Sequence, residues 1–415
     1  MRADEASAVA QLARLTLRGG TTRIHEIHQV IADRAFTAVG PVGAPVRLAH
    51  DALTGLAYGS VRFALGAGAR LAGGVAALRA DGTPLDDTPA ARAALGILNG
   101  AHGDLLEREA PGLALGMTVR VDGRAVPVER TALAAAFPEA GDRLAVFLHG
   151  LTETERAWCY RAERHHGRPD VTYGTQLQAD LGLTPVYLRY NTGRHISDNG
   201  CSLDDLLTAL VDAWPVPVQD VVLIGHSMGG LVARSALHRA GGGTAEASQW
   251  THLVRDSVTL GTPHLGAPLE RGVHRLAGVL SRLPETRGLA TLLALRSVGI
   301  KDLRRGTLVE EDWSGRDLDA PGAADHTHVP LHDGARHFVV LATWDLLVPP
   351  RSAVGDTGDD DRLAFPADHV HRLGGLTHLD LLNHPRVYAQ IKRWLEQRPE
   401  GPRPGAPDED SVTTP

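Results

Sequence analysis

The sequence predicts an α/β protein built on a mostly parallel, doubly wound sheet, with a helical N-terminal extension and an insertion late in the chain. From residue 144 onward, short apolar runs alternate with helical stretches, which is typical of a parallel sheet covered by helices on both faces. The expected strands are residues 144–148, 186–190, 221–224, 257–260, 338–341 and 369–373. Two further elements support this class. Met117–Val121 and Arg124–Val128 flank an Asp-Gly pair and predict a β-hairpin, and a final helix is expected from Pro385 through Trp394.

The pattern divides the chain into three parts. Residues 1–112 are expected to be helical, because isoleucines recur at helical spacing at positions 24, 27 and 31 and Thr88-Pro89 is typical of a helix start. Residues 113–397 hold the alternating pattern, with an insertion at about 269–336 that would lie above the carboxyl edge of the sheet, where lids are built. Residues 398–415 are rich in Pro, Gly and acidic residues, and we expect disorder there.

Composition and charge exclude several classes. Acidic residues outnumber basic ones, 49 to 42, which argues against a general affinity for nucleic acid or anionic membranes. The most apolar stretch, Ala52–Leu78, has a longest uncharged run of ten residues, too short to cross a bilayer. Buried helix packing is the favoured explanation for that stretch, and peripheral membrane contact is the alternative.

The two cysteines, Cys159 and Cys201, do not make a disulfide framework, and whether they pair is left open. The N-terminus lacks a basic segment followed by an apolar run, so we expect no secretory signal and a cytoplasmic protein. The oligomeric state cannot be read from the sequence.

The strongest motif is Gly225-His-Ser227-Met-Gly229, which lies between a β-branched run and an amphipathic helix. A serine on such a sharp strand-to-helix turn needs small neighbours two residues away on each side, and both glycines meet that need. The turn also puts the serine hydroxyl at a helix N-terminus, where backbone N–H groups favour developing negative charge. The motif predicts a nucleophilic Ser227.

A serine nucleophile needs a base and an acid, which should follow in the order acid then histidine at the ends of later strands. Asp345 ends the run that begins at Phe338, and His378 follows the run that begins at His369. The expected triad is therefore Ser227, Asp345 and His378. The alternatives for the acid and the base are Asp356, residues 359–361, Asp380 and His371.

Two backbone N–H groups are needed to stabilise an oxyanion. One should belong to Met228, directly after the nucleophile, and the other to Leu151, which follows His149-Gly150 at the end of an earlier strand. The loop after residue 190 should reach the same edge, and a structural role for Arg194 and His195 there is favoured over substrate binding.

We expect no metal site. His25-Glu26-Ile27-His28 has its second histidine one residue early for H-E-x-x-H. A second histidine group lacks the closely spaced partner cluster of a four-ligand site. It comprises His326, His328, His332 and His337, near Asp325 and Asp333.

Together these motifs resemble the α/β-hydrolase superfamily, esterase/lipase type, over residues 144–395. They are Leu148-His-Gly-Leu151, Gly225-His-Ser-Met-Gly-Gly230, Gly261-Thr-Pro-His-Leu-Gly-Ala267 and Gly375-Leu-Thr-His378. The branch that it is similar to includes bacterial lipases and GPI inositol-deacylase-like proteins. The resemblance implies an α/β-hydrolase fold and hydrolysis of acyl esters, from small molecules or lipids, without a metal or organic cofactor.

The favoured function is therefore a serine hydrolase that cleaves carboxylic esters through an acyl-enzyme on Ser227. An acyltransferase on the same triad and a catalytically idle binding or scaffold protein are the alternatives. Leucines in the insertion predict an apolar acyl pocket, so esters with aliphatic chains should be preferred over charged or very small ones. They are Leu276, Leu280, Leu283, Leu289, Leu292, Leu293 and Leu295.

Overall fold

A computed structural model describes residues 2–12, 47, 84–241, 248–267, 297–316, 327–358 and 363–397. Several sequence predictions lie outside these residues: the isoleucine-rich helix, the apolar stretch 52–78, the leucines of the insertion and the tail 398–415. Contacts divide the chain into two units, residues 1–91 with 105–114, and residues 92–104 with 115–415. The predicted boundary at residue 112 stays a prediction.

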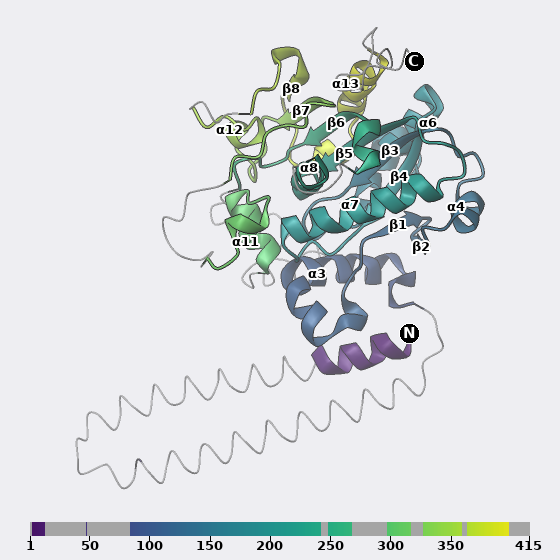
Figure 1. The fold of residues 1–415 in the computed structure, drawn as a ribbon, viewed down its shortest axis with the longest axis vertical. Coiled ribbons are helices and arrows are strands. Elements are labelled where there is room, and N and C mark those ends of the chain that lie inside the picture. The colour runs from purple at the N-terminus through teal and green to yellow at the C-terminus, as the bar shows by residue number, and fades with distance from the viewer. Residues whose placement is uncertain are drawn as a thin grey trace, which may run out of the picture. The chain divides into compact units, whose positions relative to one another are not determined.

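In the described part of the second unit, eight strands form one sheet in the order β2-β1-β4-β3-β5-β6-β7-β8 (Figure 1). β1 runs antiparallel to β2 and β4, and all other neighbours are parallel, so the predicted mostly parallel sheet is confirmed. The strands are β1 Thr118–Val121, β2 Arg124–Val126, β3 Arg143–Leu148, β4 Thr184–Arg189, β5 Asp220–His226, β6 Val254–Leu260, β7 Arg336–Ala342 and β8 Val370–Leu373.

The hairpin β1–β2 forms as predicted. Its turn residues Asp122 and Gly123 have φ values of 50° and 79°, both in the left-handed region that a two-residue hairpin turn of this twist requires. Aspartate tolerates this region better than most residues, and glycine adopts it freely, which is why this pair marks the turn.

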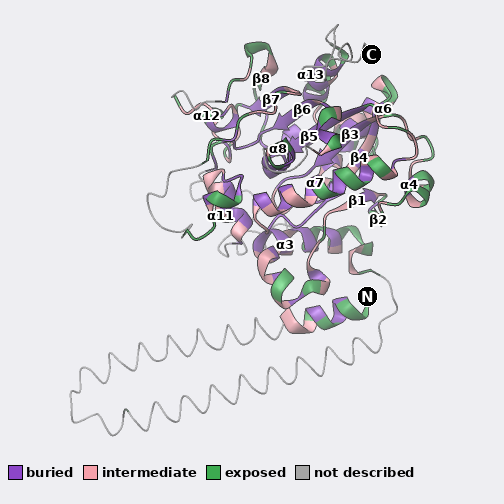
Figure 2. Cartoon of the chain, viewed as in Figure 1, coloured by how far each residue is buried: buried purple, intermediate pink, exposed green. Residues whose placement is uncertain are grey.

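Helices cover both faces of the sheet. Because side chains alternate along a strand, Leu144 and Val146 of β3 join one buried cluster with α7 and α8, whereas Ala145 and Phe147 join another with α6 and α13. All seven residues of β5 are buried, and the central strands are correspondingly coloured as buried in Figure 2. Helices in the described part of the chain include α3 Pro89–Glu109, α4 Arg130–Ala136, α5 Ala162–His166, α6 Tyr173–Leu181, α7 Ile196–Ala213, α8 Met228–Gly241, α11 Val298–Arg305, α12 Pro350–Ala353 and α13 Pro385–Glu396.

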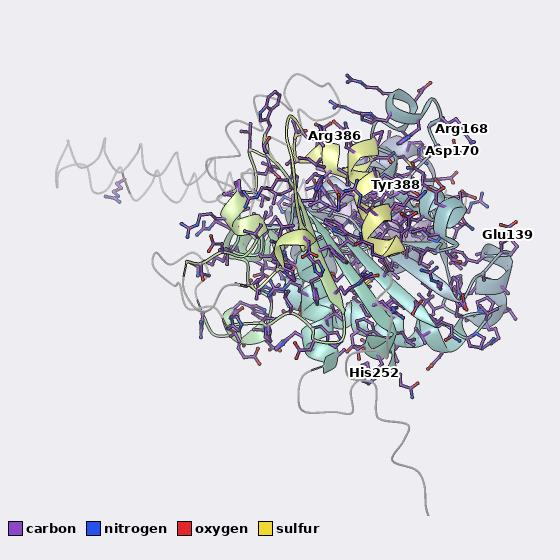
Figure 3. All side chains as sticks on the ribbon, turned by 90° about the horizontal axis from the view of Figure 1, so that it is seen from above. Glu139, Arg168, Asp170, His252, Arg386 and Tyr388 are labelled. Atoms are coloured by element: carbon purple, nitrogen blue, oxygen red, sulfur yellow. The ribbon has the colours of Figure 1, made fainter. Side chains whose placement is uncertain are left out.

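The C-terminal helix α13 is fixed to α6 by polar contacts at the margin of its apolar face. The Tyr388 hydroxyl, labelled in Figure 3, donates to Asp180 Oδ2 at 2.6 Å, and Lys392 Nζ lies 2.9 Å from the same oxygen.

None of the helices in the described ranges is long and apolar enough to span a membrane.

A buried ion pair ties β4 to the loop that follows β3. Arg189 Nε donates to Glu155 Oε2 at 2.6 Å, and the two side chains are only 1% and 7% exposed. Removing one partner of such a pair leaves a buried charge without compensation. We therefore expect Glu155→Ala to lower the free energy of unfolding by about 3–5 kcal/mol in urea denaturation.

Glu163→Ala is the matched control for this measurement, because Glu163 is exposed on α5. It should change the free energy of unfolding by less than about 0.5 kcal/mol. Equal effects of the two substitutions would show that the Glu155–Arg189 pair contributes nothing specific.

Candidate active site

Ser227 lies on the turn between β5 and α8 with φ of 51°, an uncommon conformation for a residue with a Cβ. Its N–H donates to Leu260 O of β6 at 2.9 Å, which holds the turn in place. A Cβ at Gly225 would lie 2.5 Å from Gly230 N, and one at Gly229 would lie 2.3 Å from Leu148 O. Close backbone approach therefore leaves no room for a Cβ at either glycine.

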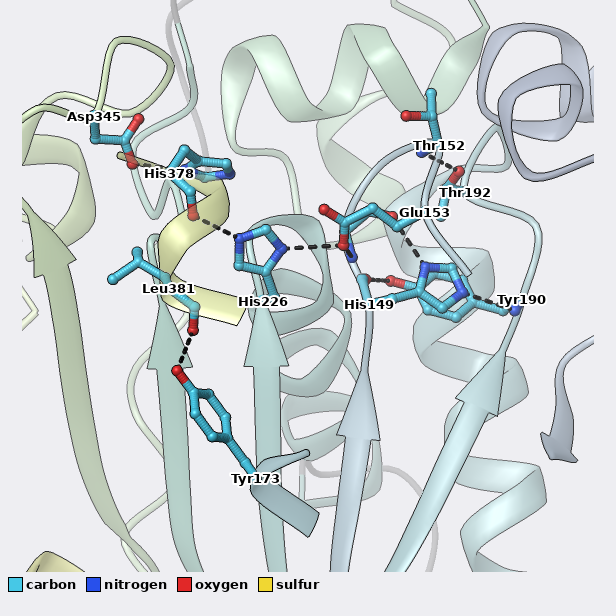
Figure 4. Close-up of polar contacts among 11 residues, drawn as sticks. His149, Thr152, Glu153, Tyr173, Tyr190, Thr192, His226, Asp345, His378 and Leu381 are labelled. Atoms are coloured by element: carbon cyan, nitrogen blue, oxygen red, sulfur yellow. Dashed lines mark hydrogen bonds and ion pairs between the residues drawn. The ribbon is translucent and has the colours of Figure 1, made fainter. Parts of the chain in front are cut away.

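His378 and Asp345 come together at the ends of β8 and β7. His378 Nδ1 lies 2.6 Å from Asp345 Oδ2, and the two side chains are 7% and 3% exposed (Figure 4). Asp345 Oδ1 accepts hydrogen bonds from the N–H groups of Leu347 and Val348 at 2.8 and 2.9 Å.

Burial alone would raise the pKa of Asp345, but His378 and the two amides outweigh it and lower that pKa below its ordinary value. The carboxylate is therefore ionised and directed at the imidazole, the arrangement in which an acid orients a general base.

Ser227 lies at the same edge of the sheet. Leu260, whose carbonyl binds the Ser227 N–H, precedes Gly261, and a Cβ at Gly261 would lie 3.0 Å from His378 Nδ1. Among the described residues no hydrogen bond joins the Ser227 hydroxyl to His378. Catalytic hydrogen bonds in free enzymes are often longer than bonding distance and tighten when substrate binds.

The loop after β3 packs against the nucleophile. A Cβ at Gly150 would lie 3.1 Å from Ser227 Cβ, so this loop and the start of α8 border one space. Within the described residues, the N–H groups of Leu151 and Met228 donate to no protein acceptor. Both remain candidate oxyanion donors.

Among the described residues, the alternative acids and base have other partners, and none of them forms a hydrogen bond with the His378 side chain. Asp380 accepts hydrogen bonds from Thr377 and Arg161, and Asp356 accepts from Gly358 N–H at 3.0 Å. His371 lies on β8 near the edge of the Trp394 ring, with 6.3 Å between ring centroids. Residues 359–361 lie outside the described ranges.

Sequence reasoning missed the pair Glu153 and His226. Glu153 Oε2 accepts the Gly150 N–H at 2.6 Å and lies 3.1 Å from His226 Nδ1, while His226 Nε2 lies 3.2 Å from the His378 carbonyl oxygen (Figure 4). Both ring nitrogens of His226 thus face acceptors, and both can donate only when the imidazole is doubly protonated. A buried imidazolium then connects the oxyanion loop to the loop of the base.

Charge pairing supports this protonation state. Burial disfavours the charge on His226, but Glu153 outweighs it and raises the pKa of the imidazole. Burial would likewise raise the pKa of Glu153, and His226 with the Gly150 N–H lowers it instead. Only the three-residue spacing between Gly150 and Glu153 hinted at this contact, because His226 comes from a distant strand.

A second histidine, His149, fixes the same loop in the neutral form. Its Nδ1 lies 3.0 Å from Gly150 O and its Nε2 accepts the Tyr190 N–H at 3.4 Å, so the proton is on Nδ1. Burial lowers the pKa of His149, which favours this neutral form. The imidazole of His149 also stacks on the Tyr190 ring, with 4.4 Å between the ring centroids.

The loop after β4 makes contacts within the chain. His195 Nδ1 lies 2.9 Å from Asp302 Oδ2 and its ring stacks on Trp313 at 3.7 Å, and Arg194 donates to the Ser202 hydroxyl. These contacts agree with the favoured structural role.

Cys159 and Cys201 are free thiols. In the described ranges no three His, Cys, Asp or Glu side chains are grouped to hold a metal ion.

Comparisons with known proteins agree with the predicted resemblance. A family model described as a PGAP1-like alpha/beta domain matches residues 188–327, which include Ser227 but neither Asp345 nor His378. A search of curated proteins finds no match. Among solved structures, the chain is similar to a lipase of Bacillus licheniformis in mature form, at 16% identity over 61% of this chain and 91% of that chain, with a TM-score of 0.34.

Two further solved structures are an esterase of Pyrococcus furiosus and the naproxen esterase of Bacillus subtilis. The first is 15% identical over 62% of this chain and 81% of that chain, with a TM-score of 0.37. The second is 14% identical over 61% and 83%, with a TM-score of 0.35.

Proposed function

We propose that this chain, which has the α/β-hydrolase fold, is a serine hydrolase that cleaves carboxylic esters through an acyl-enzyme on Ser227. The observation that carries the proposal is the 2.6 Å contact between His378 and Asp345 at the sheet edge where Ser227 is held on its strained turn. A buried carboxylate oriented on a histidine, with a serine held at the same edge of the sheet, is the arrangement that activates a hydroxyl.

In the first half of the reaction, His378 Nε2 takes the Ser227 proton as the oxygen attacks the ester carbonyl. Asp345 holds the imidazole by its Nδ1–H and stabilises the imidazolium that forms. The carbonyl oxygen becomes an oxyanion, which the N–H groups of Leu151 and Met228 would bind. His378 then gives its proton to the leaving alcohol, and the acyl group stays on Ser227.

In the second half, water replaces the alcohol. His378 takes a proton from the water as it attacks the acyl carbonyl, and returns a proton to Ser227 Oγ when the acid leaves. No metal or organic cofactor is needed for either half.

Covalent labelling by a fluorophosphonate probe tests the nucleophile directly. We expect the wild-type chain to be labelled and Ser227→Ala to be unlabelled, with both proteins checked for folding by circular dichroism. Ser202→Ala, on α7, is the matched control and should be labelled like the wild type. If the folded wild-type chain is not labelled by the probe, the alternative of a catalytically idle binding protein is favoured.

The substrate prediction concerns acyl length. If the insertion forms an apolar acyl pocket, kcat/KM for p-nitrophenyl esters should rise with chain length, by up to about fourfold per buried methylene at 0.8 kcal/mol each. A rate series from acetate to decanoate measures this. Activity confined to the acetate would contradict the apolar pocket while leaving the esterase itself in place.

A further inference from the structure

Arg234 on α8 is a buried cation without a carboxylate partner among the described residues. It is 5% exposed; its Nη2 donates to Val329 O and its Nη1 lies 3.1 Å from His264 Nδ1. Its Nε is buried and has no hydrogen-bond partner in the described structure. Burial lowers the pKa of Arg234 to about 10, which still leaves the side chain charged at neutral pH.

His264 offers a second unpartnered donor beside it. Because Arg234 can only donate, His264 Nδ1 must accept, and the proton of the neutral ring is then on Nε2. That nitrogen is buried and has no partner among the described residues. Burial and the Arg234 charge lower the pKa of His264 well below its ordinary value, so the ring stays neutral.

Both residues line a cavity of about 230 Å³. Its described polar lining is Arg234, His264, Arg305, Thr327, His328 and Thr357, and the described lining residues include no aspartate or glutamate. Leucines and a valine complete the wall. The cavity is smaller than the sites of drug-sized ligands, which suits a small ligand or the head group of a larger one.

Burying an arginine without a counter-charge is costly, and an unpartnered buried donor calls for an explanation. Guanidinium groups pair best with carboxylate and phosphate oxygens, and an anion in the cavity would supply the missing counter-charge. We propose that this cavity is a binding site for a small anion with a carboxylate or phosphate group, held by Arg234, His264 and Arg305.

The place of the cavity relates it to the candidate active site. Arg234 is seven residues after Ser227, about 10 Å along the axis of α8 at 1.5 Å per residue. His264 is three residues after Gly261, which adjoins His378. The anion could therefore be an acidic group on the substrate remote from the ester, or a free ion. The substrate case alone rests on the proposed function.

The binding experiment uses full-length Ser227→Ala, so that hydrolysis plays no part, titrated with inorganic phosphate by calorimetry at constant ionic strength. We expect saturable binding, weakened about tenfold by Arg305→Gln, as the loss of a charged hydrogen bond of roughly 1.5 kcal/mol implies. Arg304→Gln is the matched control, because Arg304 neighbours Arg305 at the end of α11 and does not line the cavity. It should bind phosphate within about twofold of the parent.

Arg234→Met tests the buried cation. The readout is the change in melting temperature on adding phosphate, which can be compared between variants even if their melting temperatures without phosphate differ. Phosphate should raise the melting temperature of the parent and of Arg304→Gln but not of Arg234→Met. Absence of saturable phosphate binding to the parent would overturn the proposal. Equal weakening by Arg305→Gln and Arg304→Gln would also overturn it, because it would indicate general surface attraction.

Kinetic measurements on the enzyme with Ser227 intact distinguish a substrate group from a free ion as the source of the anion. An ester of a dicarboxylic acid with one free carboxylate is compared with its doubly esterified, neutral analogue. If Arg305→Gln raises KM for the acidic ester only, the site binds a substrate group, and the preference for uncharged esters is wrong. If phosphate binding is lost with both KM values unchanged, the site binds a free ion. Should the enzyme prove inactive, the phosphate titration still decides the site.

Discussion

Replacing Asp345 by Asn should lower kcat for ester hydrolysis by about 10⁴, with little change in the melting temperature. The substitution keeps the shape of the side chain but puts an amide where the carboxylate faces His378 Nδ1. The ring then tends to carry its proton on Nε2, the nitrogen that must accept from Ser227, and the charge that stabilises the imidazolium is lost.

Steady-state kinetics on a p-nitrophenyl ester measure this effect, with Asp356→Asn as the control. Asp356 is an acid in the following loop that contacts Gly358 and Arg351 rather than His378. It should retain kcat within about twofold of the wild type. A kcat of Asp345→Asn within tenfold of the wild type would mean that another group orients the base.

Glu153→Gln should lower kcat by about 10²–10³ while KM changes little. Glu153 holds the Gly150 N–H and pairs with His226, so its charge fixes the loop that carries the Leu151 N–H. Losing one oxyanion donor from position costs a factor of this size, and the effect falls on the transition state rather than on substrate binding. The exposed Glu139→Gln is the control and should leave kcat unchanged.

The pH dependence distinguishes this role from a purely structural one. The pKa of His226 is raised above 6.5 and that of Glu153 is lowered below 4.5, so both groups are charged between these values. The ion pair and its contribution to stability are lost as pH rises through the raised pKa of His226, and also as pH falls through the lowered pKa of Glu153. The Asp345 charge also faces His226 and adds to the raised pKa.

Wild-type kcat should therefore fall on an alkaline limb above pH 6.5. In Glu153→Gln the carboxylate that raises the pKa of His226 is absent. Burial then lowers that pKa, so the alkaline limb should move to lower pH. An unchanged pH profile in a variant with reduced kcat would refute the positioning role and leave only a packing effect.

Local patterns predicted those features that a few consecutive residues determine. The hairpin follows from the left-handed preference of Asp122-Gly123, and the turn at Ser227 follows from two glycines that backbone contacts require. Asp345 and His378 could be proposed because carboxyl ends of parallel strands share one edge, so their order along the chain implies proximity.

Pairings between distant segments were not predictable in the same way. Glu153 and His226 are ordinary residues in their own segments, and only the alignment of β3 with β5 brings them together. Arg234 is an isolated basic residue in a mostly apolar helix pattern. That it has no carboxylate partner among the described residues is visible only in three dimensions. Burial of charge depends on tertiary packing, which short-range sequence patterns do not record.

The contacts of His226 have a consequence for how this chain can diverge. The position before the serine is written as any residue in the general motif, but here the imidazolium needs the Glu153 carboxylate, and that carboxylate needs the imidazolium. A single substitution at either position leaves the other buried charge without its partner, so the two positions should change together during evolution. We expect relatives without histidine at position 226 to lack an acid at position 153, and alignments of such relatives would show this as covariation.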